Sequence, residues 1–366
     1  MAGRKNCKKF TSRESARKIN AEKQEMNETK FVNDSALDID GAMQRLKSVV
    51  THTPLEFNAN LSRKYQCKVY LKREDLQIVR SYKLRGAYNM MCQLALEQLA
   101  KGVVCASAGN HAQGFAYSCK LLRVKGVVFM PISTPKLKVA QTKMFGENFV
   151  EVKLVGNSFD ETAVVAKAYT TEYDLTFIPP FDHPAIISGQ ATVGVEILED
   201  LPQFTKDALD YLFLPIGGGG LSAGVGAYFK STSPNTKIIG IEPAGAPSMH
   251  AAMQAGRPVE LDNIDYFVDG ASVKRVGDYT FAICKNVLDE VHLVPVGKIC
   301  STILEMYNEE AMIVEPAGAM SLAVLDAYAD QIKGKQVLCI VSGGNNDIAR
   351  IQEIQERSFI YEGLKN

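Results

Sequence analysis

The sequence predicts an α/β protein of two lobes, in which mostly parallel sheets carry helices on both faces. Short apolar segments alternate with segments of helical periodicity along most of the chain, which is the pattern of βαβ units. Three predicted strands run directly into glycine-rich or polar loops, as strands do at the ligand-binding edge of an open parallel sheet. The chain has 366 residues, which is more than one simple core usually accommodates, so we expect two lobes.

The elements can be assigned in chain order. Residues 1–30 are predicted to be a disordered basic tail, because they are polar, rich in Lys and Arg, and lack the apolar segment of a secretory signal. Strands are predicted at residues 68–72, 102–106, 126–130, 148–153, 212–216, 237–241 and 336–341. Helices are predicted at 38–50, from Gly86 onward, in the run that ends at Leu122, and at 136–145, 158–173, 186–201, 221–229, 298–309 and 317–326. Residues 259–277 are predicted to be irregular.

Composition argues against several kinds of partner. The formal net charge is zero and there is no Trp, which argues against a nucleic-acid partner. No apolar run approaches 18 residues, so no membrane span is expected. The eight cysteines include no Cys-x-x-Cys pair, and we expect reduced thiols in a cytoplasmic protein. The five histidines are far apart in the sequence, and we expect no metal site.

Lys83 lies in the segment Ser-Tyr-Lys-Leu-Arg-Gly-Ala, close to the start of a predicted helix. Unpaired backbone N–H groups at a helix start favour anions, so a lysine there is unusual. The residue is either a surface lysine on a basic turn or a lysine that forms an imine with a carbonyl cofactor. Its own segment leaves both interpretations open.

The tetraglycine loop, residues 217–220, follows a predicted strand and precedes a predicted helix. Four residues without Cβ let backbone N–H groups close around an anion, and a phosphate is the natural ligand. A flexible turn is the simpler reading, but the strand and helix flank the loop closely. A rival interpretation is a dinucleotide fold, because Gly218 to Ala223 fits G-x-G-x-x-A and Glu242 follows about 20 residues later. That interpretation implies an NAD-dependent oxidoreductase, and it leaves Lys83 and the other two loops unexplained.

Four segments together resemble the signatures of the tryptophan-synthase-β-like pyridoxal phosphate enzymes, known as fold type II. The segments are Ser-Tyr-Lys-Leu-Arg-Gly-Ala, Ser-Ala-Gly-Asn-His-Ala-Gln-Gly, Gly-Gly-Gly-Gly-Leu and Ser-Gly-Gly-Asn. Within this group they are most similar to the threonine dehydratases, also called threonine ammonia-lyases. The resemblance extends from about Phe31 to Asn366, with the segments in order and suitably spaced.

The resemblance implies a role for each matching residue. Lys83 would bond covalently to pyridoxal phosphate, Asn110 would hydrogen-bond the ring hydroxyl, and Ser342 the ring nitrogen. The phosphate would be held by Gly217, Gly218, Gly219, Gly220 and the N–H of Leu221. The substrate carboxylate would be bound by the backbone of Ser107, Ala108, Gly109, Asn110 and His111. A large cofactor-binding domain would combine residues 31–82 with 182–356, a small mobile domain would span 83–181, and 357–366 would be a connector.

The implied activity is dehydration and deamination of L-threonine to 2-oxobutanoate and ammonia, and of L-serine less well. Alternatives are a serine dehydratase, a serine racemase or a catalytically inactive binding protein of the same fold. Ala108 stands where the related racemases carry a serine that acts as acid and base, so little racemisation is expected. Ser248 stands where the racemases supply a carboxylate to a cation, which weakens the case for a cation site. A homo-oligomer is expected.

The last residues, from Ser358 to Asn366, resemble the connector that leads into the isoleucine-binding regulatory domain of longer threonine dehydratases. Too few residues follow the predicted helix end at 352–357 to form such a domain. The sequence therefore predicts a catalytic core that isoleucine does not inhibit.

Overall fold

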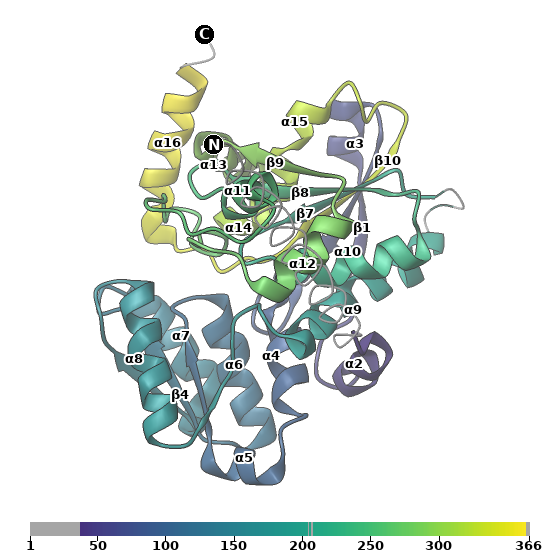
Figure 1. Ribbon diagram of the computed structural model, residues 1–366. Coiled ribbons are helices and arrows are strands. Elements are labelled where there is room, and N and C mark those ends of the chain that lie inside the picture. The colour runs from purple at the N-terminus through teal and green to yellow at the C-terminus, as the bar shows by residue number, and fades with distance from the viewer. Residues whose placement is uncertain (1–36, 204, 206–207, 364–366) are drawn as a thin grey trace, which may run out of the picture. The chain divides into compact units, whose positions relative to one another are not determined.

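The structure is a computed structural model that describes residues 37–203, 205 and 208–363. The basic tail predicted at residues 1–30 lies outside the described residues, as do the last three residues of the predicted connector. The chain from Asp38 on is one compact unit, and its described part contains two sheets (Figure 1). The prediction of an α/β fold with mostly parallel sheets is confirmed, whereas the exact domain boundaries stay a prediction.

The larger sheet has the strand order β1-β2-β10-β7-β8-β9, and the smaller has the order β5-β4-β3-β6. Every neighbouring pair is parallel except β1 with β2. The strands of the larger sheet are β1 (Leu55–Asn58), β2 (Lys68–Arg73), β10 (Gln336–Val341), β7 (Tyr211–Pro215), β8 (Lys237–Pro243) and β9 (Glu290–Val294). Those of the smaller sheet are β5 (Val150–Leu154), β4 (Gly126–Met130), β3 (Val103–Ala106) and β6 (Thr176–Phe177).

Helices border both sheets. In the described residues they are α2 (Ile39–Leu46), α3 (Ala59–Tyr65), α4 (Lys83–Met91), α5 (Leu96–Lys101), α6 (Asn110–Leu122), α7 (Lys136–Gly146), α8 (Phe159–Glu172), α9 (Pro184–Asp200), α10 (Gly220–Thr232), α11 (Ser248–Ala255), α12 (Asp278–Val287), α13 (Val296–Glu310), α14 (Pro316–Ala323), α15 (Leu325–Tyr328) and α16 (Ile351–Gly363). Short 3-10 turns are η1 (Glu74–Leu76), η2 (Glu147–Phe149), η3 (Leu201–Gln203) and η4 (Ile348–Arg350). None of these helices is long and apolar enough to cross a membrane.

Strand β10 shows why the larger sheet needs helices on both faces. All six of its residues are buried. Val337, Cys339 and Val341 pack in the cluster that contains α13 and α14, whereas Leu338 and Ile340 pack with α9 and α10. Successive side chains of a strand point to opposite faces, so a continuous apolar run requires cover on each side.

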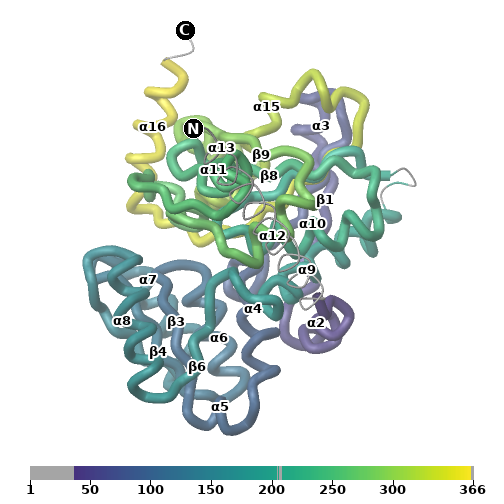
Figure 2. Tube along the Cα trace, viewed as in Figure 1, coloured from purple at the N-terminus to yellow at the C-terminus, as the bar shows by residue number. Residues whose placement is uncertain are grey.

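The smaller sheet is covered in the same way. Val103 and Cys105 of β3 pack in the cluster that includes residues of α4 and α6. Val104 and Ala106 of the same strand pack with Ala166 of α8 on the other face. Figure 2 shows β3 and β4 between α8 on one side and α6 on the other.

All seven predicted strands are present within two residues of their predicted ends, and three further strands are present that were not predicted. β1 was missed because it is a four-residue edge strand with an exposed Phe57, and β6 because it has only two residues. β9 reads Glu-Val-His-Leu-Val and is only partly buried, so it lacks the apolar run that marked the central strands. Four helices were also missed, namely α3, α5, α11 and α12. The helix predicted at 317–326 is divided into α14 and α15. Residues 357–363, predicted as part of a connector, continue α16.

The start of α4 is fixed by a buried network of charges centred on Arg85. Its guanidinium makes paired hydrogen bonds to both carboxylate oxygens of Glu74 in η1, at 2.9 and 2.7 Å. It makes a second pair to Glu196 in α9, at 2.6 and 2.8 Å. Lys72 of β2 also contacts Glu196, at 2.7 Å. All four side chains are almost completely shielded from solvent, so η1, β2, α4 and α9 are joined through charge pairs that water does not screen.

Glycines allow the close approach that this network requires. A Cβ atom at Gly189 of α9 would lie 2.6 Å from the carbonyl oxygen of Arg85. A Cβ atom at Gly86 of α4 would lie 2.3 Å from the side-chain amide nitrogen of Gln190. The backbones of α4 and α9 are therefore in near contact. This short distance between the two helices brings the Glu196 carboxylate within reach of the Arg85 guanidinium.

We predict that Arg85→Ala lowers the free energy of unfolding by about 3–5 kcal/mol, because the buried carboxylates of Glu74 and Glu196 both lose the guanidinium, although Lys72 still contacts Glu196. Denaturant titration followed by circular dichroism measures the loss. Lys101→Ala is the matched control, since Lys101 and Asp174 form an exposed pair whose side chains are 52% and 82% accessible, and such pairs contribute about 1 kcal/mol or less. Equal losses for the two variants would show that the network does not stabilise the fold.

Candidate active site

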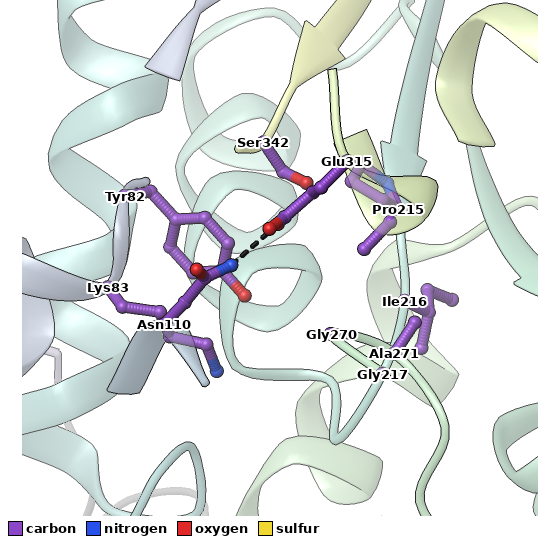
Figure 3. A pocket seen from close by; sticks show the side chains of 11 residues that line it. Tyr82, Lys83, Asn110, Pro215, Ile216, Gly217, Gly270, Ala271, Glu315 and Ser342 are labelled. Atoms are coloured by element: carbon purple, nitrogen blue, oxygen red, sulfur yellow. Dashed lines mark hydrogen bonds between the residues drawn. The ribbon is translucent and has the colours of Figure 1, made fainter. Parts of the chain in front are cut away.

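Three loops that follow parallel strands meet at one cavity, as the sequence predicted. Asn110 follows β3, Gly217 follows β7, and Ser342 follows β10. The empty space is about 280 Å³, part of it open to solvent. It is lined by Tyr82, Lys83, Asn110, Pro215, Ile216, Gly217, Gly270, Ala271, Glu315, Ala317 and Ser342. Figure 3 shows Lys83 and Asn110 on one side of this cavity and Ile216, Gly217, Gly270 and Ala271 on the other.

Lys83 is the first residue of α4, and no side chain caps that helix at its N-terminus. Its amine donates a hydrogen bond to the carbonyl of Pro180 at 3.0 Å. Burial lowers the pKa of Lys83 to about 8, and the carboxylate of Glu315 opposes part of that shift. A lysine with this pKa has a much larger neutral fraction near neutral pH than an exposed lysine, and a nucleophilic amine must be neutral.

The tetraglycine loop forms the N-terminal end of α10, which also lacks a side-chain cap. Gly219 has a φ of +91°, a conformation that a residue with a side chain rarely adopts. The hydroxyl of Thr280 donates to the carbonyl of Gly218 at 2.7 Å and holds the loop in place. A Cβ atom at Gly218 would lie 2.3 Å from the ring of Phe181, so the ring packs directly on the loop.

Of the tetraglycine loop and Leu221, only Gly217 is among the residues that line the cavity. Leu221 is buried with the residues between the larger sheet and α10. The first-turn N–H groups of α10 still lack a side-chain partner at the helix start. The predicted role of Gly218, Gly219, Gly220 and the Leu221 N–H in holding a phosphate stays a prediction.

The loop between β3 and α6 brings only Asn110 to the cavity lining. Ser107, Ala108, Gly109 and His111 are not among the lining residues. Ser107 accepts a hydrogen bond from the N–H of Gly109 at 3.2 Å. His111 is buried with one ring nitrogen 3.0 Å from the carbonyl of Ile178. Burial, together with the charge of Lys83, lowers the pKa of His111 to about 3, so the ring is neutral at physiological pH.

Ser342 joins the last strand of the larger sheet to the segment that carries Lys83. Its carbonyl accepts the N–H of Tyr82 at 3.4 Å, and Ser81 forms an isolated antiparallel bridge with Gly343. The side chain of Ser342 lines the cavity and is almost completely buried. Segments about 260 residues apart in the sequence therefore form one wall of the site.

Glu315 is the functional candidate that the sequence reasoning missed. It lies one residue before α14, lines the cavity, and is only 4% exposed. Its carboxylate accepts a hydrogen bond from the side-chain amide of Asn110 at 2.5 Å, drawn as the dashed line in Figure 3. Burial raises the pKa of Glu315 to about 7. The signal in the sequence was a single acid after the apolar residues Met-Ile-Val and before a proline that begins a helix.

Gly270 and Ala271 were also missed, because they lie in the segment that was predicted only as irregular. They approach the tetraglycine loop closely, since a Cβ atom at Gly217 would lie 2.9 Å from the Cα of Ala271. The contact closes the cavity on the side opposite Lys83. No periodicity in residues 259–277 could have revealed this contact.

Glu242 is not arranged as the acid of a dinucleotide site. It is completely buried and accepts the N–H groups of Met249 and His250, at 2.7 and 2.8 Å, where α11 begins. A carboxylate used in this way is not available to a ribose. In the described part of the chain, no group of three or more His, Cys, Asp or Glu side chains could hold a metal ion.

Comparisons with known proteins identify the family. Residues 46–343 match the family described as pyridoxal-phosphate dependent enzyme. The chain is 56% identical to a biosynthetic L-threonine dehydratase of Halalkalibacterium halodurans, over 90% of this chain and 78% of that protein. It is 55% identical to the biosynthetic L-threonine dehydratase of Bacillus subtilis, over 89% of this chain and 76% of that protein.

Solved structures agree with the sequence comparisons. The processed form of threonine deaminase isoform 2 from Solanum lycopersicum superposes with a TM-score of 0.80 at 41% identity, covering 88% of this chain and 94% of that one. The family match covers most of the chain, and the sequence relatives exceed half identity. The chain therefore belongs to the pyridoxal-phosphate dependent enzyme family.

Proposed function

We propose that this protein is a pyridoxal-phosphate-dependent L-threonine dehydratase, which converts L-threonine to 2-oxobutanoate and ammonia, and L-serine less well to pyruvate. The observation that carries the proposal is the high identity to biosynthetic threonine dehydratases along about nine-tenths of the chain. Because those relatives are named biosynthetic, we assign the activity to isoleucine biosynthesis. The cavity with Lys83 supports a covalent reaction at an amino acid rather than simple binding.

The residues at the cavity fit the cofactor. The uncapped start of α10, with glycine at four successive positions before Leu221, offers backbone N–H groups to a phosphate. Among the described residues, no side chain is hydrogen-bonded to the Ser342 hydroxyl, which lines the cavity and suits a ring nitrogen. Tyr82 provides an aromatic ring beside Lys83, with the amine 5.3 Å from the ring centre. When bound, pyridoxal phosphate supplies an electron sink for the bonds at the substrate Cα.

Each residue then has a defined task. Lys83 would hold the cofactor through its neutral amine, and the same amine is placed to accept the proton from the substrate Cα. Asn110 would orient the cofactor ring at its hydroxyl, and Ser342 would face the ring nitrogen with a neutral group. A neutral serine would not stabilise a fully protonated ring as an aspartate would. The backbone of residues 107–111 orients the substrate carboxylate.

We also infer a homo-oligomer in the cytoplasm. The seven described cysteines are free thiols, as is usual in a reducing compartment. Large apolar side chains stay exposed on neighbouring helices, with Tyr307 of α13 at 57% and Phe359 of α16 at 79%. These two side chains are available to a contact between copies of the chain.

The experiment that tests the proposed function is an assay of purified protein with L-threonine. We expect a 2-oxo acid to form, and we expect Lys83→Ala to abolish its formation while the fold is retained, because no other amine lines the cavity among the described residues. Spectrophotometric detection of 2-oxobutanoate and a thermal melt measure the two properties. Lys101→Ala, at an exposed surface position, is the control and should keep full turnover. Turnover by Lys83→Ala at the normal rate would refute the assignment.

The glycine loop gives a second prediction. Gly219→Ala should weaken pyridoxal phosphate binding at least about tenfold, or about 1.4 kcal/mol. The new Cβ would lie 2.9 Å from the Cε of Met249 in a positive-φ conformation, so the loop must shift. Gly256→Ala is the matched control, since Gly256 has a φ of +68° but nothing within 4 Å of the new Cβ.

Equilibrium titration of the cofactor-free protein with pyridoxal phosphate measures both variants. Gly256→Ala should lose about 1–2 kcal/mol of stability and bind the cofactor normally. Cofactor binding by Gly219→Ala that matches the Gly256→Ala control would contradict the role of this loop.

The pKa of Lys83 gives a third prediction. Attachment of the cofactor requires the neutral amine, and burial lowers the pKa of that amine to about 8. The rate of attachment to cofactor-free protein should therefore rise with pH and reach half its maximum near pH 8. Glu315→Gln should move this midpoint to lower pH, because the Glu315 carboxylate raises the pKa of Lys83. Stopped-flow absorbance measures the rate, and a midpoint near 10.5 in both proteins would show that Lys83 behaves as an exposed lysine.

A further inference from the structure

The segment Glu-Pro-Ala-Gly-Ala occurs twice in the chain, at residues 242–246 and 315–319. Both glutamates are buried, at 0% and 4% exposure, and burial raises the pKa of each to about 7. Their partners differ completely. Glu242 accepts N–H groups at the start of α11, whereas Glu315 lines the cavity and accepts the amide of Asn110. The first is a structural contact, and the second needs an explanation at the site.

The side-chain amide of Asn110 is held at both ends. Its nitrogen donates to Glu315 at 2.5 Å, and its oxygen accepts from the side-chain nitrogen of Asn345 at 2.8 Å. The same nitrogen of Asn345 also donates to the carbonyl of Val79 at 3.0 Å, so its own orientation is fixed. An amide nitrogen can only donate, so rotation of the Asn110 amide by half a turn would lose the contact with the Asn345 nitrogen. It would also lose the contact with Glu315 whenever that carboxyl is ionised.

The carboxylate of Glu315 has little freedom to move. A Cβ atom at Gly343 would lie 2.3 Å from its Oε1, and one at Gly270 would lie 3.5 Å from the same atom. The backbone N–H of Glu315 donates to the carbonyl of Gly343 at 3.2 Å. Two glycines and a backbone contact therefore form a narrow slot that holds the acid against Asn110.

We propose that Glu315 is a positioning residue of the cofactor site that acts through Asn110. By accepting one N–H of the Asn110 amide, with Asn345 on the amide oxygen, it leaves the second N–H for the ring hydroxyl of the cofactor. The inference rests on the proposed function, in which Asn110 contacts that hydroxyl. It assigns a reason for a buried acid at the N-cap of α14 whose side chain makes no capping hydrogen bond to that helix.

Substitutions of Glu315 can separate the effect of its side-chain length from the effect of its charge. Glu315→Asp keeps the charge but is one methylene shorter, so it cannot reach Asn110 from the same slot. Glu315→Gln loses the charge but keeps an acceptor at the same distance. We expect pyridoxal phosphate to bind about tenfold more weakly to Glu315→Asp and Glu315→Ala, and within about threefold of the wild type to Glu315→Gln. A role that depends on charge alone predicts the opposite order and would overturn the proposal.

A double-mutant cycle tests the route through Asn110. Asn110→Ala should weaken cofactor binding by at least as much as Glu315→Ala, and the double variant should be no weaker than Asn110→Ala alone. The dissociation constants come from titration of cofactor-free protein, with a thermal melt of each variant to show that it is folded. Additive effects would mean that Glu315 acts independently of Asn110, and the proposal would be wrong.

Glu242→Ala is the matched control, since it removes a buried acid from the same pentapeptide. It should lower the melting temperature without changing the dissociation constant of pyridoxal phosphate. A change as large as that of Glu315→Ala would show that the loss reflects general destabilisation, which overturns the proposal. Failure of the wild-type protein to deaminate threonine would instead refute the substrate assignment, because the readout here is cofactor binding and not turnover.

Discussion

The guanidinium of Arg85 is the contact on which the geometry of the site depends. It lies two residues after Lys83 and bonds at once to η1 and α9, while Lys72 of β2 completes the charge balance. Buried ions are costly unless every partner is in place, so this arrangement tolerates few alternatives. The start of α4 cannot shift or rotate without leaving a carboxylate unpaired. Lys83 is therefore presented to the cavity by a helix start whose position is fixed by this buried network.

Much of the fold could be predicted from the sequence, for a simple physical reason. Strands buried on both faces are continuous apolar runs, and all seven that were predicted are of this kind or border such strands. The strands that were missed lie at sheet edges, as β1, β6 and β9 do. β1 and β6 are short, and β9 is polar and only partly buried, so length or hydrophobicity did not distinguish these strands from loops, whereas the edge strand β5 was recognised.

Some residues of the site could likewise be predicted from the sequence, and others could not. Lys83, Asn110, Gly217 and Ser342 could be identified because they follow strands or begin helices, in segments whose composition is unusual. Glu315 and Gly270 could not, because their importance arises only from what packs against them. The repeated pentapeptide makes this plain, since five identical residues end a strand at Glu242 and begin a helix at Glu315. Tertiary contacts, and not local sequence, decide what each glutamate does.

The position of β10 in the larger sheet has a consequence for synthesis of the chain on the ribosome. β10 comes after every other described strand, yet it lies between β2 and β7. Until β10 has been made, β2 on one side and β7 on the other each lack the parallel neighbour that they have in the folded sheet. Unpaired strand edges readily pair with other chains. The two halves of the larger sheet, with the parts of the active site that they carry, are therefore joined only when β10 inserts between them.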